Sequence, residues 1–332
     1  MNKIQTLSVE ITDKCQLLCR HCSTEASPEK SAFLPIEGIK KVLYQALELG
    51  AKNLTLSGGE PLLHPRLFDI LNIASNLNYK TNIYTSGILA NNESISIEMM
   101  EKLPNSVNKI IFSLHSSDKN CHDDITGVKG SFEKTVFSLR CALNIGLNTE
   151  VHIVPMSKNY RDIPELLKRL AYLGIENVSL LRLVPQGRCL HNKKLLMSKK
   201  ESQEFLQTIK KFEQKNKLPV LRKGAPYRYL FGEEAGCCSA GEDKILISPN
   251  GDIHPCEAFK YDEADSNVLE DDLINIWNND KRLNKVRDLK LNQIEFCKKC
   301  EKVEICRAGC PGQRKYANKN MWDGPDPGCT VL

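Results

Sequence analysis

The chain has 332 residues and a formal net charge of +5, and 41% of its residues are hydrophobic and 26% charged. These proportions are typical of a globular protein, and they exclude a long disordered tail. No apolar run approaches the roughly 18 residues that would span a bilayer, and the N-terminus lacks the continuous apolar stretch of a secretory signal. The sequence therefore predicts a soluble, cytoplasmic protein without a membrane partner.

The modest positive charge does not indicate a nucleic-acid partner. Lysine pairs at positions 193–194, 199–200 and 210–211 lie in a polar helical stretch that has no interleaved aromatic residues. Such pairs are typical of a helix face that is solvated rather than bound to nucleic acid.

Strand and helix patterns alternate through the first half of the chain. Residues 7–12 alternate with a period of two, and a helical pattern begins at Pro35 and ends at Gly50. Further strand patterns fall at 53–57, 80–85, 109–114, 149–154 and 177–184, and further helix patterns fall near 66–78, 94–103, 131–145 and 160–173. About six such βα units predict a parallel sheet, either doubly wound or rolled into a barrel. In both architectures the functional residues gather at the C-terminal ends of the strands.

The repeat is expected to stop at Pro185, which ends a barrel predicted over residues 1–185. Residues 186–235 predict a helical linker. Within the remaining residues 236–332, an Asn-Gly turn at 250–251 lies between two short strand patterns and predicts a β-hairpin. The cysteine-dense end beyond this hairpin predicts a small domain stapled by metal.

Cysteine is the unusual feature of the composition, with 14 residues in the chain. Disulfides are rare in a reducing compartment, so clustered thiols indicate metal or redox chemistry. Cys121 and Cys141 fall in a predicted loop and a predicted helix, and both are expected to be inert. Three cysteines follow the first predicted strand at positions 15, 19 and 22, and eight crowd the last hundred residues at 237, 238, 256, 297, 300, 306, 310 and 329.

The first three cysteines have the spacing C-x3-C-x2-C on one loop. Three thiolates in this arrangement can hold three corners of a four-iron cluster and leave one iron open to a chelating small molecule. Two glycines after the second strand, Gly58 and Gly59, would let the backbone approach that molecule closely. The alternatives are a zinc site, with His21 or His115 as the fourth ligand, or a thiol redox pair.

This cysteine motif, the run Ser57, Gly58, Gly59, Glu60 and Pro61, and the six βα units together resemble the radical S-adenosylmethionine (SAM) enzymes over about residues 5–185. The resemblance implies a partial (β/α)6 barrel. It implies that Cys15, Cys19 and Cys22 hold a [4Fe-4S] cluster whose unique iron binds SAM, and that the run from Ser57 to Pro61 contacts the methionine amino group. Reduction would then yield methionine and a 5′-deoxyadenosyl radical that abstracts a substrate hydrogen.

The resemblance implies further SAM contacts at the strand ends. His21 is expected against the adenine, where many relatives place an aromatic hydrocarbon ring. Ser86 and Ser113, after the third strand and near the end of the fourth, are expected to contact the ribose or carboxylate, with an ordinary helix cap or turn residue as the alternative. Val184, at the end of the sixth strand, is expected to contact SAM as well.

Two residues after the sixth strand are candidates for catalysis. Arg188 either faces the site or pairs at the surface. Cys189 resembles the thiol that returns a hydrogen atom to a substrate radical in relatives that invert amino-acid stereochemistry. The alternative for Cys189 is a buried loop thiol.

The C-terminal cysteine spacing resembles the SPASM extension of radical SAM enzymes. The resemblance implies an outer auxiliary [4Fe-4S] cluster held by Cys297, Cys300, Cys306 and Cys329. It also implies an inner auxiliary [4Fe-4S] cluster held by Cys237, Cys238, Cys256 and Cys310. With the barrel cluster, this makes three clusters in all. The inner set is complete only if the adjacent Cys237 and Cys238 both bind; otherwise one iron is left open. A zinc-stapled module is the alternative.

SPASM-type relatives mostly modify peptides or proteins by crosslinking, oxidation or epimerisation, and this is the first functional hypothesis. The barrel begins within the first dozen residues, so we expect either a separate leader-binding protein or recognition of the substrate core alone. A flavodoxin or ferredoxin is the expected reductant. The second hypothesis is modification of a small molecule such as an alcohol, an aminoglycoside or a tetrapyrrole. The third is a non-enzymatic metal-binding scaffold.

Overall fold

The computed structural model describes residues 3–105, 107–233 and 238–329. Its strands are β1 (Thr6–Thr12), β2 (Asn53–Gly58), β3 (Lys80–Thr85), β4 (Val107–Ser113), β5 (Thr149–Ile153), β6 (Asn177–Leu180), β7 (Val220–Lys223), β8 (Lys244–Ile247) and β9 (Ile253–His254). They form a nine-stranded sheet in the order β7-β6-β5-β4-β3-β2-β1-β8-β9. Neighbouring strands are parallel except for the antiparallel pair β8 and β9.

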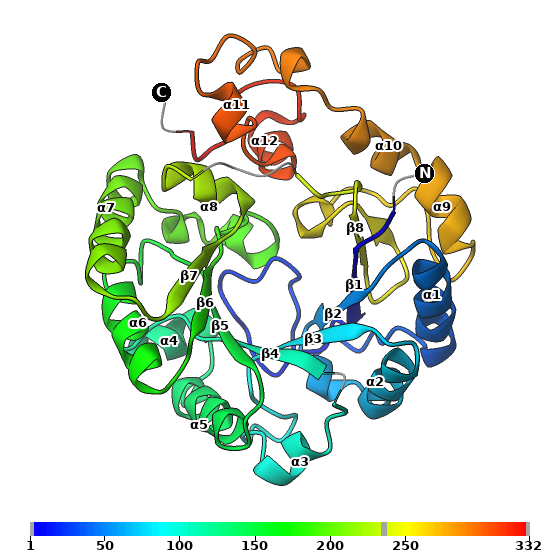
Figure 1. Ribbon diagram of the computed structural model, residues 1–332, viewed down its shortest axis with the longest axis vertical. Helices are drawn as coiled ribbons and strands as arrows, with labels where there is room; N and C mark the ends of the chain where they lie inside the picture. The colour runs from blue at the N-terminus through cyan, green and yellow to red at the C-terminus, as the bar shows by residue number, and fades with distance from the viewer. Residues whose placement is uncertain (1–2, 106, 234–237, 330–332) are drawn as a thin grey trace.

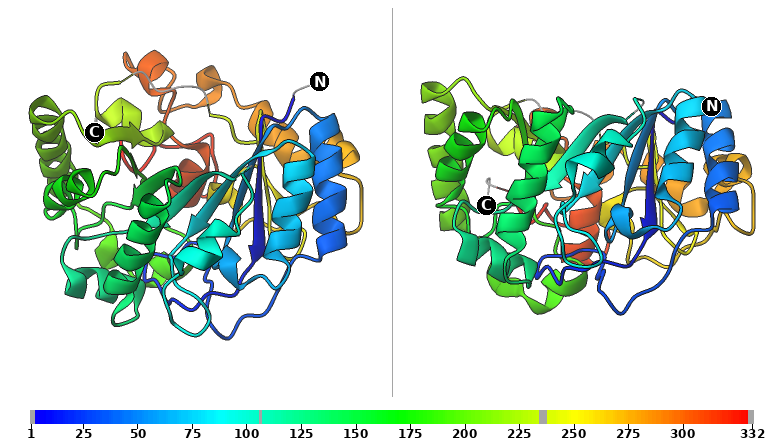
Figure 2. Two further views of the ribbon diagram at one scale, coloured as in Figure 1. Left: turned by 60° about the horizontal axis from the view of Figure 1, so that its bottom comes forward. Right: turned by 90° about the horizontal axis from the view of Figure 1, so that it is seen from below.

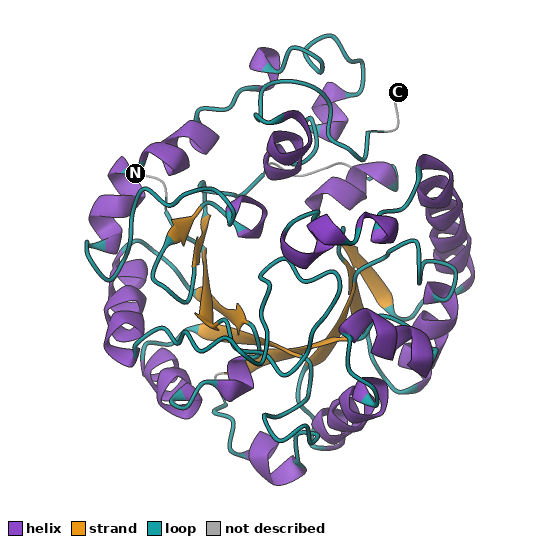
Figure 3. Cartoon of the chain, turned by 180° about the vertical axis from the view of Figure 1, so that it is seen from behind, coloured by secondary structure: helices purple, strands orange, loops and turns teal. Residues whose placement is uncertain are grey.

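Helices cover the outer face of this sheet and its open side, as Figures 1 and 3 show. They are α1 (Ile36–Glu48), α2 (Leu67–Asn76), α3 (Ile97–Glu101), α4 (Lys119–Thr126), α5 (Ser131–Asn144), α6 (Ile163–Tyr172), α7 (Lys199–Lys215), α8 (Ala225–Leu230), α9 (Leu273–Asn279), α10 (Lys281–Arg287), α11 (Val303–Cys306) and α12 (Pro311–Asn318). The curved sheet is open on one side, and α10, α11 and α12 lie across the opening (Figure 1).

The partial barrel predicted from the sequence is confirmed. Strands β1 to β6 follow one another around the sheet in chain order, so the doubly wound alternative is wrong. The predicted helices correspond to α1, α2, α3, α5 and α6, and the predicted hairpin corresponds to β8 and β9. The Asn-Gly turn therefore correctly predicted the antiparallel pairing of β8 and β9.

Strand β1 shows why the helices lie on the outer face of the sheet. Its alternate residues Leu7, Val9 and Ile11 are buried in the main apolar core, together with the residues of α1 that recur at helical spacing, such as Ile39 and Val42. An amphipathic helix and a strand with apolar residues on one face bury each other's apolar surface in this way. The other face of β1 carries Ser, Glu and Thr, and this polar face looks into the barrel.

Two elements of the barrel region were not predicted. Residues 220–223, expected within a helical linker, form β7 and pair in parallel with β6. Residues 119–126, expected as a loop, form α4, whose first turn is capped by Asp118 through the backbone N–H of Cys121. Cys121 thus lies in a helix, which corrects its placement in a loop. The division into three segments stays a prediction, and β8 from the expected C-terminal domain pairs in parallel with β1.

The polar interior of the barrel is organised around Glu150 of β5. Its carboxylate accepts hydrogen bonds from Lys109, His152 and Ser179 and forms an ion pair with Arg222. Burial alone would raise the pKa of Glu150, but these hydrogen bonds outweigh burial and hold the pKa well below its ordinary value. The interior can therefore keep a charged carboxylate.

No helix within the described ranges is long and apolar enough to cross a membrane.

Candidate active site

The loop that follows β1 lies at the edge of the sheet to which the strand arrows point, as Figure 2 shows. Cys15, Leu17, Ala26 and Ile88 form a small buried cluster there, and Cys19 and Cys22 pack against it. The predicted C-x3-C-x2-C thiols are thus brought together on one side of the loop.

The surroundings of these thiols favour a metal centre. Burial, the Glu60 carboxylate and Cys22 together raise the pKa of Cys15 to about 12. Burial and the two neighbouring thiols raise the pKa of Cys19 well above its ordinary value. Three thiolates so close together need compensating cations, which iron ions supply when they bind sulfur directly. Among the described residues no three His, Cys, Asp or Glu side chains converge tightly enough to hold a single metal ion. Three cysteine thiols gathered around one buried cluster are nonetheless the ligand type that holds iron-sulfur clusters, so the residues present fit such a cluster.

The end of β2 lies directly against the cysteine loop. The backbone N–H groups of Gly59 and Glu60 donate to the carbonyls of Thr12 and Lys14, at 2.7 and 2.8 Å. A Cβ on Gly59 would lie 2.1 Å from the Lys14 carbonyl oxygen, and Gly58 has a φ of +130°, which favours glycine. The close approach of the two backbones therefore requires both glycines. The sequence analysis had explained them only by the approach of the backbone to a bound molecule.

Glu60 is buried, and its carboxylate links the end of β2 to the end of β3. Its carboxylate accepts from the Thr85 hydroxyl at 2.8 Å and from the Ser86 backbone N–H and hydroxyl at 2.8 and 2.6 Å. Gln16, between the first two motif cysteines, donates to the Ser86 hydroxyl at 2.8 Å and to the Ile88 carbonyl. Ser86 therefore links the second strand end to the cysteine loop.

Gln16 was missed by the sequence analysis, because nothing in its local pattern marks it. Its buried Oε1 atom has no hydrogen-bond partner among the described residues. An unpaired buried acceptor costs free energy, so it is available to a donor group of a bound molecule.

Three histidine rings meet at the ends of the first and fourth strands. The ring centroids of His21 and His115 lie 4.5 Å apart in an edge arrangement, and those of His115 and His122 lie 5.9 Å apart and stacked. Burial lowers the pKa of His21 to about 4, so the ring is neutral at pH 7. A neutral, half-buried ring at this position suits contact with an aromatic base.

Of the remaining predicted SAM contacts, Ser113 is half-buried at the end of β4, and Pro61 is buried at the start of a short 3-10 turn. Val184 is half-buried after β6 and accepts a backbone hydrogen bond from Gln186 at 2.8 Å. Their contacts with SAM stay predictions.

Arg188 holds the cysteine loop through its backbone. Its Nε donates to the Cys19 carbonyl at 2.9 Å, its Nη2 donates to the Ala26 carbonyl at 2.8 Å, and its own N–H donates to the Cys22 carbonyl at 3.0 Å. The neighbouring Gly187 has a φ of +54°, and a Cβ there would lie 2.6 Å from the Cys22 carbonyl oxygen. The geometry thus indicates a positioning residue, and a catalytic role for Arg188 stays a prediction.

We expect Arg188→Met to weaken iron retention at the barrel cysteines by about tenfold, because groups that orient metal ligands typically matter to that degree. Arg188→Lys keeps the charge but cannot donate to both carbonyls, so it should fall between the parent and Arg188→Met. The measurement is bound iron against chelator concentration. Arg161→Met, which alters an exposed ion pair with Glu204, is the control. Equal retention in Arg188→Met and the parent would contradict the positioning role.

Cys189 is fully buried in a small apolar cluster with Ile125, Met156, Leu183 and Leu195. Burial raises the pKa of its thiol to about 11. The hydrogen-donor role predicted for it stays a prediction, and in this structure its side chain is covered by apolar neighbours.

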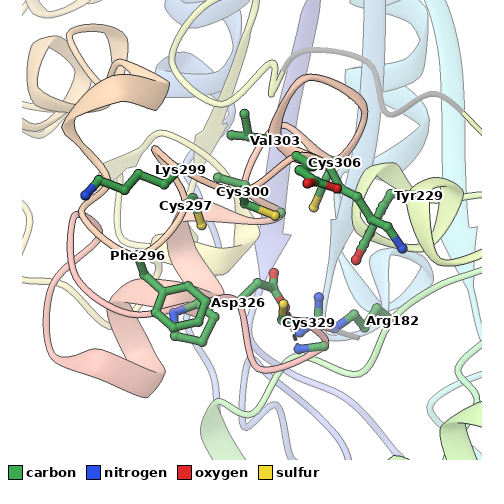
Figure 4. A pocket seen from close by; sticks show the side chains of 16 residues that line it. Arg182, Tyr229, Phe296, Cys297, Lys299, Cys300, Val303, Cys306, Asp326 and Cys329 are labelled. Atoms are coloured by element: carbon green, nitrogen blue, oxygen red, sulfur yellow. Dashed lines mark hydrogen bonds and ion pairs between the residues drawn. The ribbon is translucent and has the colours of Figure 1, made fainter. Parts of the chain in front are cut away.

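The four cysteines assigned to the outer cluster share one cavity of about 390 Å³. Cys297, Cys300, Cys306 and Cys329 all line it, as Figure 4 shows. Burial raises the pKa of Cys306 to about 11. The cavity is formed by residues 296–309 on one side and 325–329 on the other, so the structure brings together thiols from two separate segments.

Of the cysteines assigned to the inner cluster, the described Cys238, Cys256 and Cys310 lie near one another. Burial raises the pKa of Cys256 well above its ordinary value, and the neighbouring Cys310 and Cys238 raise it further. The residue after Cys256, Glu257, accepts from the Lys244 ammonium at 2.8 Å, and Lys244 begins β8. Cys237 lies outside the described residues.

Comparisons with known proteins agree with this geometry. The radical SAM superfamily matches residues 9–170, and the iron-sulfur cluster-binding domain named SPASM matches residues 237–301. Fold, cysteine loop and cysteine-rich end together define an iron-sulfur enzyme built on a partial barrel. The chain belongs to the radical SAM superfamily and carries a C-terminal SPASM domain. This assignment favours iron-sulfur clusters over the zinc alternatives, and an enzyme over the non-enzymatic scaffold.

Similar proteins include a bacteriocin biosynthesis protein, a peptide cyclase and a heme synthase. The antilisterial bacteriocin subtilosin biosynthesis protein AlbA of Bacillus subtilis is 29% identical over 81% of this chain, which spans 58% of AlbA. The PqqA peptide cyclase of Gluconobacter oxydans is 28% identical over 98% of this chain and 90% of the cyclase. The AdoMet-dependent heme synthase of Methanosarcina barkeri is 24% identical over 99% of this chain and 97% of the synthase.

Among solved structures, Streptococcus suis SuiB bound to the precursor peptide SuiA matches with a TM-score of 0.80 at 18% identity, over 99% of this chain and 76% of SuiB. At this identity the match shows that the fold is shared.

Proposed function

We propose that this chain modifies a ribosomally made peptide or protein through a crosslink, an oxidation or an epimerisation. The observation that carries this proposal is the similarity to the PqqA peptide cyclase, which extends over nearly the whole of both chains and so includes barrel and tail. The similarity to AlbA supports the same substrate class.

In the proposed reaction the barrel residues hold the cofactors. Cys15, Cys19 and Cys22 bind a [4Fe-4S] cluster, which with bound SAM supplies hydrogen abstraction from the substrate. Glu60 keeps the second and third strand ends together, and Arg188 keeps the cysteine loop in place. The contacts assigned to SAM are Ser57, Gly58, Gly59, Glu60, Pro61, Ser86, Ser113, Val184 and His21.

The tail is proposed to hold two auxiliary [4Fe-4S] clusters, giving three clusters per chain. Cys237, Cys238, Cys256 and Cys310 belong to the inner one, and Cys297, Cys300, Cys306 and Cys329 to the outer one. The ion pairs of Lys244 with Glu257 and of Lys260 with Glu10 balance charge between the inner cysteines and the barrel interior. A flavodoxin or ferredoxin is proposed as the electron donor. The peptide is proposed to be recognised either through a separate leader-binding protein or through its core alone.

The test is coexpression of the enzyme with short peptides encoded beside its gene, followed by mass spectrometry of each peptide. We expect a mass or retention change in one peptide that is absent when Cys15, Cys19 and Cys22 are all replaced by alanine. No change in any peptide, while the enzyme cleaves SAM, would count against a peptide substrate.

Modification of a small molecule is the second candidate, because the AdoMet-dependent heme synthase matches over nearly the full length of both chains. The two candidates differ in what stimulates SAM cleavage. A neighbouring peptide should raise the rate of 5′-deoxyadenosine formation if the first is correct, and a porphyrin precursor or alcohol should do so if the second is.

A further inference from the structure

A buried ion pair joins the barrel to the cysteine-rich tail. Arg182 lies two residues beyond the end of β6, and its Nη2 pairs with a carboxylate oxygen of Asp326, which lies three residues before Cys329. The side chain of Arg182 is 12% exposed and that of Asp326 is 7% exposed. A buried carboxylate and guanidinium are kept only when each is well paired.

The carboxylate of Asp326 also binds the backbone on both sides of the tail. One oxygen accepts from the backbone N–H of Cys310 at 2.8 Å, and the other accepts from the N–H of Gly328 at 2.6 Å. The backbone carbonyl of Asp326 accepts from the N–H of Cys329 at 2.8 Å. One residue therefore fixes the backbone of Cys310, assigned to the inner cluster, and of Cys329, assigned to the outer cluster.

Two glycines let the backbone close around this pair. Gly309 has a φ of +69°, and a Cβ there would lie 2.6 Å from a carboxylate oxygen of Asp326. A Cβ on Gly328 would lie 3.0 Å from the guanidinium carbon of Arg182. A side chain at Gly309 or Gly328 would push the ion pair of Arg182 and Asp326 away from the backbone N–H groups to which Asp326 binds.

The same pair forms part of the wall of the outer-cysteine cavity. Arg182 and Asp326 both line it, and Figure 4 shows them beside Cys329. The other charged residues of the wall, Lys299, Glu301 and Lys302, are exposed. Within the wall of the cavity the buried charges are therefore those of Arg182 and Asp326, and the buried Arg314 also lies near Cys297.

We propose that Arg182 and Asp326 form a positioning unit that fixes the ligand loops of the two auxiliary clusters relative to each other and to the barrel. This inference rests on the proposed function, since it takes Cys310 as an inner ligand and Cys329 as an outer ligand. Neither charged residue binds iron in this arrangement. They act through the backbone of the ligands, as groups around metal sites commonly do.

The test uses the full chain with Cys15, Cys19 and Cys22 replaced by alanine, so that all remaining iron belongs to the tail. In this background Asp326→Asn, Arg182→Gln and Arg182→Lys are compared after anaerobic reconstitution. Two quantities are measured: iron retained against chelator concentration, and the electron paramagnetic resonance spectra of the reduced clusters. Asp272→Asn, which removes the charge of Asp272 from its exposed ion pair with Lys41, is the matched control.

We expect Asp326→Asn to weaken iron retention by about tenfold or more and to alter the signals of both clusters, because it removes the charge that holds both loops. Arg182→Gln should act in the same direction, and Arg182→Lys should restore part of the loss. Asp272→Asn should match the background protein. Should Asp326→Asn fail to fold, Arg182→Gln and Arg182→Lys carry the comparison.

Three outcomes would overturn the inference. In the first, the background protein holds two tail clusters, and the Asp326 and Arg182 variants match it in iron retention and in spectra. The positioning role then fails, and the proposed function stands. If the signal of one cluster alone changes, the pair does not join the two loops. If the tail of the background protein binds no iron-sulfur cluster, the proposed cluster assignment fails and the inference fails with it.

Discussion

Replacing Cys15, Cys19 and Cys22 together by alanine is expected to abolish SAM cleavage and to remove about four irons per chain, the content of one cubane cluster. The three thiols are the proposed cluster ligands, and the loop after β1 brings them together. Alanine removes every sulfur atom while leaving the loop's backbone contacts with Arg188 in place. The measurement is iron content together with 5′-deoxyadenosine formed from SAM and a strong reductant.

Cys121→Ala is the control for this variant, because Cys121 lies in α4 and is not among the cysteines assigned to a cluster. It should leave iron content and SAM cleavage at the parent values. Continued 5′-deoxyadenosine formation by the triple variant would show that the barrel cysteines are not the site of SAM cleavage.

Gly59→Ala is expected to reduce SAM cleavage by about 100-fold, the loss that a displacement of about 1 Å near a reacting centre can cause. The new Cβ would lie 2.1 Å from the Lys14 carbonyl oxygen and 2.6 Å from the Lys14 carbonyl carbon. Both are backbone atoms of the cysteine loop, so the loop or the end of β2 must move. The measurements are the rate of 5′-deoxyadenosine formation and the affinity for SAM.

Gly224→Ala is a matched control, since a Cβ at Gly224 would meet nothing nearer than the Leu180 carbonyl at 4.0 Å and its φ is −56°. It should leave SAM cleavage close to that of the parent. A Gly59→Ala enzyme with normal cleavage and normal SAM affinity would mean that the β2 end and the cysteine loop are not held as tightly as their backbone contacts indicate.

Local sequence patterns were sufficient to predict much of the fold and several of the candidate site residues. Strands β1 to β6 have apolar runs or alternation flanked by turns, and the β8–β9 hairpin has its own Asn-Gly turn, so each is encoded by neighbours in the chain. The cysteine motif and the glycines after β2 were recognised because their spacing is itself the signal.

Elements fixed by distant contacts escaped prediction. β7 is four residues long, with two of them exposed, and it becomes a strand only because the edge of β6 is available for pairing. Gln16 acts on residues 70 or more positions away, and Arg188 reaches carbonyls 162 and 169 positions away. Arg182 and Asp326 are 144 residues apart in the sequence. No local period marks such residues, so their roles became visible only in three dimensions.

The pairing of β8 with β1 means that the chain cannot be divided at the linker without damage to both parts. β1 leads directly into the cysteine loop, and β8 supplies the backbone hydrogen bonds along one of its edges. A barrel expressed without the tail would expose that edge, which is a template for association with other chains. Barrel and tail should therefore gain and lose structure together, as one cooperative unit, and loss of order in the tail would reach the cysteine loop through a single strand.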